Sequence, residues 1–562
     1  MIDSKFQFKS TQDPEKIKEL FSLCGTQWGG PLTPEEFGTL HAETLLQYRK
    51  DGGKIIPFYI EDSTSKVVVA CTIIKFLKAL YKPADKSSLI SSTPDPASFG
   101  VRNITAILVS YVFTHKDYRK QGLAESCISQ AIAATEDEII KEKLASSNDA
   151  DIDNFKKMTL DDYTGQIDKS LATYYLGKEY IWILYSGVNT YYRRFGFKSY
   201  PLDFYQIPVP ILTEGQESLI EHLIKDAETG KQASPDTKSH QVGKRIKLLN
   251  WDNKEDRGLI DYILQTKELA MLSELNKLVF HTDLQSDHRS HTSLTNMSSI
   301  LAMSKPGSVS GGGAGELSAI EENSGGGTQE NHINKPSGDD QSTRKSLALN
   351  QTVSKFSIKP CFDDYKTKVI AAQGVAKTEK SKEHCKIQGV ILTNDLQRKS
   401  YYVLWNVLKG EFFITGMGEI SYENVLPGTF RRRGSSFTGL NDLGGFNFQD
   451  LDILISAAVY NAKNRSSVFK EVFVATTDLP SEVPDPVLYD FFLNYLPMSS
   501  YASEEHRLKK EDERAKGEEK NKVEFIINGA ERVGVLPMVR QFGNASPEFE
   551  LDWLENGMWC WG

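Results

Sequence analysis

The chain has 562 residues, of which 66 are basic and 75 acidic, so its formal net charge is −9. Its content of 39% hydrophobic and 10% aromatic residues is typical of a globular protein, and the acidic balance argues against a protein that follows the phosphates of a nucleic acid. At about 150 residues per domain this length predicts three to four domains, provided that every residue is folded.

Neither a membrane span nor a secretory signal is visible in the sequence. The longest apolar runs fall short of the roughly 18 residues that a spanning helix needs, and the N-terminal stretch MIDSKFQFKS lacks an apolar core. We therefore expect a cytoplasmic protein with no membrane partner. The six cysteines form no C-x-x-C pair, which predicts six free thiols and neither a disulfide framework nor a metal site.

Two segments have a composition that cannot build a core. Residues 281–355 contain no Phe, Tyr or Trp, where a 10% aromatic content would place about seven, and they carry runs such as SGGGTQ. This is the composition of a disordered low-complexity linker. The second segment, 503–522, is dense in charges of both signs and is expected to be an exposed helix or a loop insertion.

The N-terminal block, 1–210, is predicted to contain helices followed by strands. Residues 13–24 suit a short helix, and Thr33, Pro34 and Glu36 supply the N-cap, first-turn proline and carboxylate of a capping box, so a second helix begins there. Three strands are then expected at 54–62, 67–74 and 103–114, because each run is rich in β-branched or aromatic residues. The last strand leads through a tight turn into a helix with apolar residues at helical spacing.

That turn, Arg119-Lys120-Gln121-Gly122-Leu123-Ala124, is a candidate anion site. A helix start offers unpaired N–H groups and the positive end of the helix dipole, and small residues allow a ligand close to the backbone. The same pattern, R-x-x-G-x-A, recurs at 540–545, but no helical pattern follows it there. We interpret the second copy as coincidence.

The next part of the block is a strand at 180–187 followed by a short helix that ends at Gly196 and Phe197 and leads into a further strand. Tyr192 lies four residues before Gly196. A helical connector, 211–280, follows, with helices predicted at 213–228 and 255–280. The C-terminal block, 356–562, is predicted to contain strands at 387–394, 400–408, 411–416 and 469–476, and helices at 448–463 and 486–496.

The R-x-x-G-x-A turn after a strand, followed in order by a strand and a helix ending in Y-x-x-x-G-F, resembles the two nucleotide-side motifs of the GNAT acetyl-CoA-dependent N-acyltransferases. Within that superfamily, LYSGVNTYYRRFGF and the final ENGMWCWG resemble the fungal acetyl-CoA:L-lysine N6-acetyltransferases of lysine catabolism. The likeness covers residues 1–210 well and the C-terminal block loosely. Two departures are the long 281–355 insertion and the stretch ACTIIKF in the third strand, which has no acidic residue.

The resemblance implies an α/β (α+β) fold of the GNAT type, with a second, degenerate GNAT-like lobe that supplies one wall of the acceptor cleft. It also implies acetyl-CoA as cosubstrate, with the pantetheine arm between two central strands that part. Tyr192 is then the general acid that protonates the departing thiolate. The implied cofactor-binding residues are Val112, Phe113 and Thr114 on the strand edge and Arg119, Lys120, Gln121, Gly122, Leu123 and Ala124 in the turn.

The expected acceptor is a small-molecule amine, the ε-amine of free L-lysine, acetylated by direct transfer in a ternary complex. A protein or histone lysine acetyltransferase and a non-catalytic acyl-CoA-binding scaffold are the alternatives. Glu61, Asp62 and His115 are the nearest candidates for a base, with a surface role the stronger interpretation of His115. Cys127, on the helix after the turn, is expected to be a core residue. The sequence leaves the oligomeric state open.

Overall fold

A computed structural model describes residues 5–84, 100–146, 176–229, 243–276, 353–375, 383–421, 446–498 and 522–561. The predicted linker 281–355 lies outside the described residues except for its last three positions, and the charged run 503–522 lies outside except for Lys522. Within the described ranges, no helix is both long and apolar enough to cross a membrane.

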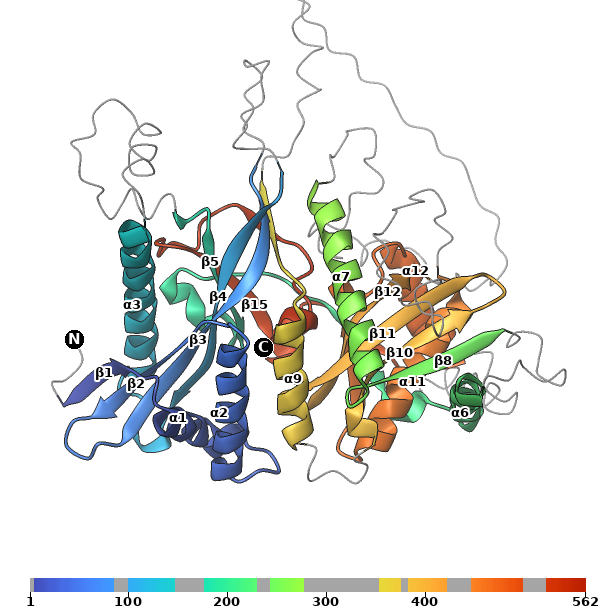
Figure 1. Cartoon of the computed structure of the whole chain (residues 1–562), viewed down its shortest axis with the longest axis horizontal. Coiled ribbons are helices and arrows are strands. Elements are labelled where there is room, and N and C mark those ends of the chain that lie inside the picture. The colour runs from blue at the N-terminus through green and yellow to red at the C-terminus, as the bar shows by residue number, and fades with distance from the viewer. Residues whose placement is uncertain are drawn as a thin grey trace, which may run out of the picture.

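Two lobes lie side by side, each built on a mixed sheet (Figure 1). The first sheet has the order β1-β2-β3-β4-β5-β15-β6, with β9 pairing β3 and β16 pairing β9. Its strands are β1 Phe6–Ser10, β2 Ile55–Asp62, β3 Val68–Lys82, β4 Arg102–Thr114, β5 Tyr180–Ser186, β6 Lys198–Ser199, β9 Ser354–Ile358, β15 Leu536–Gln541 and β16 Leu551–Trp553.

Helices cover both faces of this sheet. Helix α3 (Leu123–Ser146) places Ile128, Ala131 and Ile132 in one hydrophobic cluster with residues of β2 to β5. Helices α1 (Pro14–Trp28) and α2 (Pro34–Lys50) pack on the opposite face. The predicted capping box is confirmed, since the Glu36 backbone N–H donates to the Thr33 hydroxyl and the Thr33 N–H donates to the Glu36 carboxylate.

The second sheet has the order β14-β7-β13-β12-β11-β10-β8. Helices α6 and α11 pack on one of its faces, and α7 and α9 cover the other. The bounds are β7 Phe204–Pro208, α6 Glu214–Thr229, β8 Lys244–Asn250, α7 Lys254–Asn276, α9 Phe362–Val375, β10 Ile387–Asn394, β11 Lys399–Leu408, β12 Glu411–Ile420, α11 Phe448–Arg465, β13 Glu471–Ala475, α12 Asp485–Asp490, β14 Glu524–Ile526 and α14 Gly529–Val533.

The two lobes repeat one topology and exchange one strand each. In both sheets a parallel pair, β4 with β5 and β12 with β13, is followed by a strand contributed from the other half of the chain. Strand β15 from the C-terminal block pairs β5 in the first lobe, and β7 pairs β13 in the second. The sheets therefore do not follow the sequence limits 1–210 and 356–562, and β8 of the second sheet lies inside the expected helical connector 211–280.

The lobes meet through α2 and α9 and through the C-terminal residues, which lie between them (Figure 1). Lys366 of α9 forms an ion pair of 2.7 Å with Asp51 at the end of α2, and Asp364 of α9 forms one of 3.2 Å with Lys75 of β3. The mixed α/β fold class predicted from the sequence is confirmed, and the second lobe repeats the strand topology of the first. All six cysteines are free thiols, as predicted.

Candidate active site

The two central parallel strands of the first lobe part partway along their length. Residues 105–108 of β4 pair with residues 180–183 of β5, and the last pair is Leu108 with Ile183. Beyond this pair, β4 pairs with β3 alone, and β5 pairs with β15 alone. The side of β4 that faces β5 thus has free backbone groups, which is the feature that the resemblance implies for an extended ligand arm.

A β-bulge lies on the free part of β4. Tyr111 and Val112 together face Thr72 of β3, and Tyr111 adopts a left-handed backbone conformation with φ +50°. The predicted edge residues Val112, Phe113 and Thr114 follow or belong to this bulge. Val112 packs toward the α3 face and Phe113 is buried on the α1 and α2 face, so a ligand at this edge meets backbone rather than these side chains.

The turn after β4 presents unpaired donors. Residues 119–122 are all exposed, and within the described chain no hydrogen bond uses the backbone N–H groups of residues 121–125. Lys120 and Gly122 have φ of +64° and +72°, and open space surrounds the position where a Cβ on Gly122 would stand. Several free N–H groups at the start of a 24-residue helix are suited to a pyrophosphate.

The side chains of the turn divide into two groups. Arg119 donates to the Gln27 side chain at 2.7 Å and to the Thr114 carbonyl at 3.3 Å, so it braces the turn against α1 and β4. Leu123 is buried against Ile60 and Val69 and anchors the helix start, while Lys120 and Gln121 are exposed and Ala124 is half-buried. Cys127 is buried, as predicted, and burial raises the pKa of its thiol well above the usual value.

Tyr192 lies in a 3-10 helix, Asn189–Phe195, and is only 8% exposed. It belongs to the hydrophobic cluster beneath α3, with its ring 6.2 Å from those of both Phe195 and Phe197. Burial raises the pKa of its hydroxyl, which has no hydrogen-bond partner among the described residues. The hydroxyl is therefore a protonated donor at neutral pH, as a general acid requires.

The helix that carries Tyr192 is fastened to the turn. Arg194 forms an ion pair of 3.1 Å with Glu125 in the first turn of α3. At the other end, Gly196 has φ +86°, and an added Cβ there would come within 2.6 Å of the Ala545 backbone. The structure thus brings Tyr192 and the start of α3 together through both packing and charge.

One group near the bulge had no signature in the sequence. The Tyr111 hydroxyl lies 3.0 Å from Nδ1 of His41 in α2, and the two rings contact Phe21 and Phe37. Burial lowers the pKa of His41 to about 4, so the imidazole is neutral at neutral pH. A lone histidine on a helix 70 residues before its partner offers no spacing pattern by which sequence reasoning could find the pair.

The three base candidates have other partners in the structure. Glu61 forms ion pairs with Lys9 at 2.7 Å and Lys16 at 3.7 Å, and its hydrogen bond from Lys9 lowers the pKa of the carboxyl. Asp62 pairs with Lys5 at 3.1 Å and accepts from backbone N–H groups of the following turn. His115 caps the short helix after β4 through Asp117. These contacts are structural, and two strands, β3 and β4, separate Glu61 and Asp62 on β2 from β5.

The second lobe repeats the parting strands without an open helix start. Strands β12 and β13 pair only over residues 412–414, and a bulge at Thr415 follows. The N-terminus of α11 is capped, since Asn447 accepts from the Asp450 N–H, and Asp450 forms a buried ion pair of 2.7 Å with Lys244. At the end of β13, Asp478 accepts from the Met558 N–H at 2.7 Å, so the C-terminal residues occupy this position.

The second R-x-x-G-x-A copy has a structural role. Arg540 on β15 forms an ion pair of 2.5 Å with Glu136 of α3, and the Gly543 N–H donates to the same oxygen at 2.8 Å. No helix follows within the described residues 542–550, in agreement with the interpretation that this copy is not an anion site.

Comparison with known proteins gives only distant likenesses. Neither a protein-family model nor a curated protein matches the chain. A solved GCN5-related N-acetyltransferase from Kribbella flavida is 7% identical at a TM-score of 0.33, with 95% of this chain and 72% of that one covered. A conserved Enterococcus faecalis V583 protein described as a probable N-acyltransferase is 10% identical at a TM-score of 0.33, with 96% and 73% covered.

A predicted acetyltransferase from Clostridium acetobutylicum, solved with acetyl-CoA, is 12% identical at a TM-score of 0.16, with 29% of this chain and 94% of that one covered. Likenesses at these TM-scores are too weak to support a fold or a function. The class of protein therefore follows from the geometry of the first lobe alone.

Proposed function

We propose that the protein is an acetyl-CoA-dependent N-acetyltransferase that acetylates the ε-amine of free L-lysine. The observation that carries this proposal is the combination, in one lobe, of two parting parallel strands, an open helix start after the first strand, and the Tyr192 hydroxyl beside them. Each feature alone is common in α/β proteins, whereas together they suit a thioester substrate with a phosphate-bearing tail.

The residues present fit acetyl-CoA. The free N–H groups of residues 121–125 would hold the pyrophosphate, with Lys120 adding a positive charge beside it. The free edge of β4, including Val112, Phe113 and Thr114, would pair with the pantetheine amides. Acetyl-CoA supplies the activated acetyl group, and the chain supplies the orientation.

In direct transfer, the amine nitrogen forms a bond to the acetyl carbon while the carbon–sulfur bond breaks. A backbone N–H of β4 near the bulge would donate to the carbonyl oxygen, on which negative charge develops; one such donor is worth about 3 kcal/mol. Tyr192 would donate its proton to the thiolate that leaves, and the amine loses a proton to water or to a neighbouring base. Tyr192 is suited to this because burial keeps it protonated.

The acceptor must first lose its charge. A lysine ε-amine has a pKa near 10.4, so about 1 molecule in 2,500 is neutral at pH 7, a deficit of roughly 4.6 kcal/mol. A neutral imidazole can accept a proton, and that of His41 lies beside the bulge of β4, 3.0 Å from the Tyr111 hydroxyl. We name it as a candidate that the sequence did not indicate.

A small acceptor is favoured over a protein. The cavity between the lobes, on the face of the first sheet opposite α3, measures about 30 Å³ and is lined by residues of both lobes. A cavity of this volume has room for one small group of an acceptor, whereas a protein substrate needs a groove that is open along its length. The free hydroxyl of Tyr192 and the open turn favour an enzyme over a non-catalytic acyl-CoA-binding scaffold.

The test is direct. Purified protein with acetyl-CoA and free lysine is expected to release CoA, measured with a thiol reagent, and to yield N6-acetyllysine by mass spectrometry. Peptides with internal lysines serve as the competing acceptors. Turnover of peptides without turnover of lysine would overturn the acceptor assignment, and no CoA release with any amine would overturn the transferase assignment.

A further inference from the structure

The cavity between the lobes borders the point at which β4 and β5 part. Lys75 and Leu77 of β3 line it, and Lys75 pairs across the sheet with Leu108, the last residue of β4 that pairs with β5. Cys560 lines another side of the cavity. Its Sγ lies 2.5 Å from the hydroxyl of Tyr185, in the part of β5 that no longer pairs with β4. A ligand group in this cavity would therefore lie next to the proposed site of acetyl transfer.

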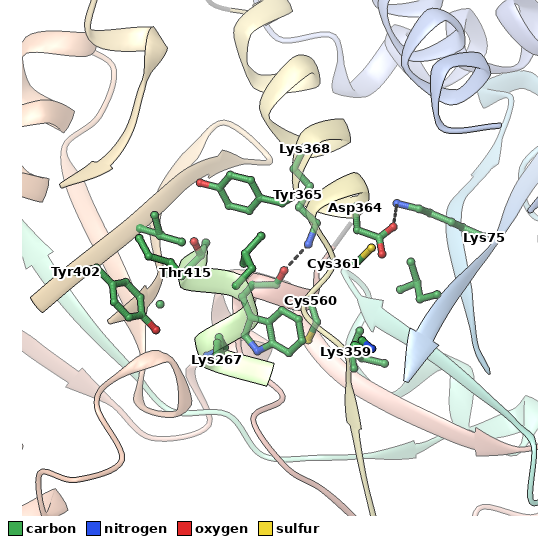
Figure 2. A pocket seen from close by; sticks show the side chains of 17 residues that line it. Lys75, Lys267, Lys359, Cys361, Asp364, Tyr365, Lys368, Tyr402, Thr415 and Cys560 are labelled. Atoms are coloured by element: carbon green, nitrogen blue, oxygen red, sulfur yellow. Dashed lines mark hydrogen bonds and ion pairs between the residues drawn. The ribbon is translucent and has the colours of Figure 1, made fainter. Parts of the chain in front are cut away.

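The wall of this cavity is rich in cations. Lys75, Lys267, Lys359 and Lys368 line it, against one carboxylate, Asp364 (Figure 2). Three of the lysines are neutralised, because Lys75 pairs with Asp364, Lys267 with Glu555 at 2.9 Å and Lys359 with Glu268 at 2.6 Å. The remaining positive charge is that of Lys368.

Lys368 forms no ion pair within the described residues. Its ammonium donates to the backbone carbonyl of Trp559, the contact that Figure 2 draws as a dashed line. Burial lowers the pKa of Lys368 to about 8, which is the expected response of a buried cation without a counter-ion. An anion beside it would restore the balance of charge.

Two further donors face the same space. The hydroxyls of Tyr402 on β11 and Thr415 at the bulge of β12 line the cavity, and neither has a hydrogen-bond partner among the described residues. An ionised carboxylate only accepts hydrogen bonds, so it suits hydroxyl donors that have no other acceptor.

We propose that this cavity binds the α-carboxylate of an amino-acid acceptor, with Lys368 as the charged partner and Thr415 and Tyr402 as hydroxyl donors. The proposal rests on the proposed acetyltransferase function and adds the recognition element for its substrate class. A space of about 30 Å³ holds about two water molecules, which the two oxygens of a carboxylate would replace. The second lobe thereby supplies specificity to chemistry performed by the first.

The test compares acceptors that share one amine and differ in the carboxylate. Lysine and 6-aminohexanoate carry it, and cadaverine (1,5-diaminopentane) does not. The native chain is expected to use lysine and 6-aminohexanoate with a kcat/KM about 10- to 100-fold above that of cadaverine. Lys368→Met is expected to remove most of this preference by raising the KM for lysine and for 6-aminohexanoate.

Lys366→Met is the matched control, since Lys366 lies on the same helix and pairs with Asp51 away from the cavity. It is expected to keep the preference. If Lys368→Met does not fold, Thr415→Val preserves volume and is expected to reduce the preference about 3- to 10-fold.

Equal use of cadaverine and lysine by the native chain, or a preference that survives both cavity variants, would overturn the carboxylate site while leaving the transferase assignment intact. Absence of CoA release with all three amines would instead show that the proposed function itself fails.

Discussion

Burial determines what the Tyr192 hydroxyl can do. The ring lies in the core beneath α3, so the phenolate is disfavoured and the proton is retained at neutral pH. The hydroxyl is nevertheless without a partner among the described residues, which makes it available to a leaving group. Tyr191 next to it is half-buried, and its ring lies 4.5 Å from the Arg194 guanidinium.

Because only the Tyr192 hydroxyl is assigned a role in proton transfer, only one of two neighbouring substitutions is expected to lower kcat. Tyr192→Phe removes only the hydroxyl and is expected to lower kcat about 100-fold, because general acids contribute roughly 10²- to 10⁴-fold. The dissociation constant for acetyl-CoA, measured by calorimetry, is expected to stay within about twofold. Tyr191→Phe is the control and should keep the native kcat. A native kcat in Tyr192→Phe would remove the tyrosine from the mechanism.

Single residues were predictable where the chain places them at fixed spacing. The positions of Tyr192 and of the Arg119–Ala124 turn relative to a strand and a helix could be predicted, and Arg194 next to Tyr192 pairs with Glu125 at the start of α3. Their roles in the reaction stay predictions. Lys368 and His41 could not be predicted, since their meaning depends on neighbours hundreds or tens of residues away. From the sequence alone, a lysine in a helix is expected to be exposed to solvent, and only the fold shows that Lys368 contacts Trp559 near the C-terminus.

At the level of elements, α3 holds the exchanged strand β15 in place. One oxygen of Glu136 accepts from the Arg540 guanidinium at 2.5 Å, from Nε1 of Trp182 at 2.9 Å and from the Gly543 N–H at 2.8 Å. Arg540 is only 6% exposed, so its charge depends on this one carboxylate. The cluster joins α3, β5 and β15, three elements that surround the proposed acyl site.

Glu136→Gln keeps the volume and removes the charge. We expect it to lower the free energy of unfolding by about 3 kcal/mol, because a buried arginine is left without its counter-ion. Glu138→Gln, on the exposed side of the same helix where Glu138 pairs with Lys54, is expected to cost less than about 0.5 kcal/mol. Chemical denaturation measures both, and equal losses would contradict the special role of Glu136.

The elements themselves were largely predictable, and their pairing was not. The capping box, the apolar helix faces and the β-branched runs gave α1, α2 and the central strands, because these patterns are local. Strand β7 was expected in the first lobe and pairs in the second, since its partner edge on β13 lies about 265 residues further along the chain. Short strands such as β1 and β16 lack the length that makes alternation visible.

At the scale of the whole molecule, the C-terminal residues hold the lobes together. Tyr185 of the first sheet, Lys368 of α9, Lys267 of α7 and Asp478 of the second lobe all contact residues 555–560. Gly557 is required at this point, because an added Cβ would lie 2.3 Å from an Asp478 oxygen. The relative position of the lobes, and with it the cavity between them, therefore depends on a buried polar group.

Asp478 makes this contact dependent on pH. Burial raises the pKa of its carboxyl from 3.8 to about 7, so the folded protein binds this proton more tightly than the unfolded chain does. The contribution of Asp478 to the free energy of unfolding is therefore most favourable below pH 3.8, and this advantage is lost as the pH rises through about 7. Asp478→Asn mimics the protonated form and removes this dependence.

Relative to the native chain, Asp478→Asn is therefore expected to gain stability with rising pH. The difference in unfolding free energy should grow in favour of the variant by about 2 to 3 kcal/mol between pH 5 and pH 8, measured by urea unfolding at each pH. Glu550→Gln, at an exposed position near the same segment, is expected to show a constant difference. A difference for Asp478→Asn that is constant, or that changes in the opposite direction, would mean that the Asp478 carboxylate is ionised in the folded protein. In that case the charge of Lys267 and the hydrogen bond from the Met558 N–H hold the carboxylate, and attraction between charges joins the lobes.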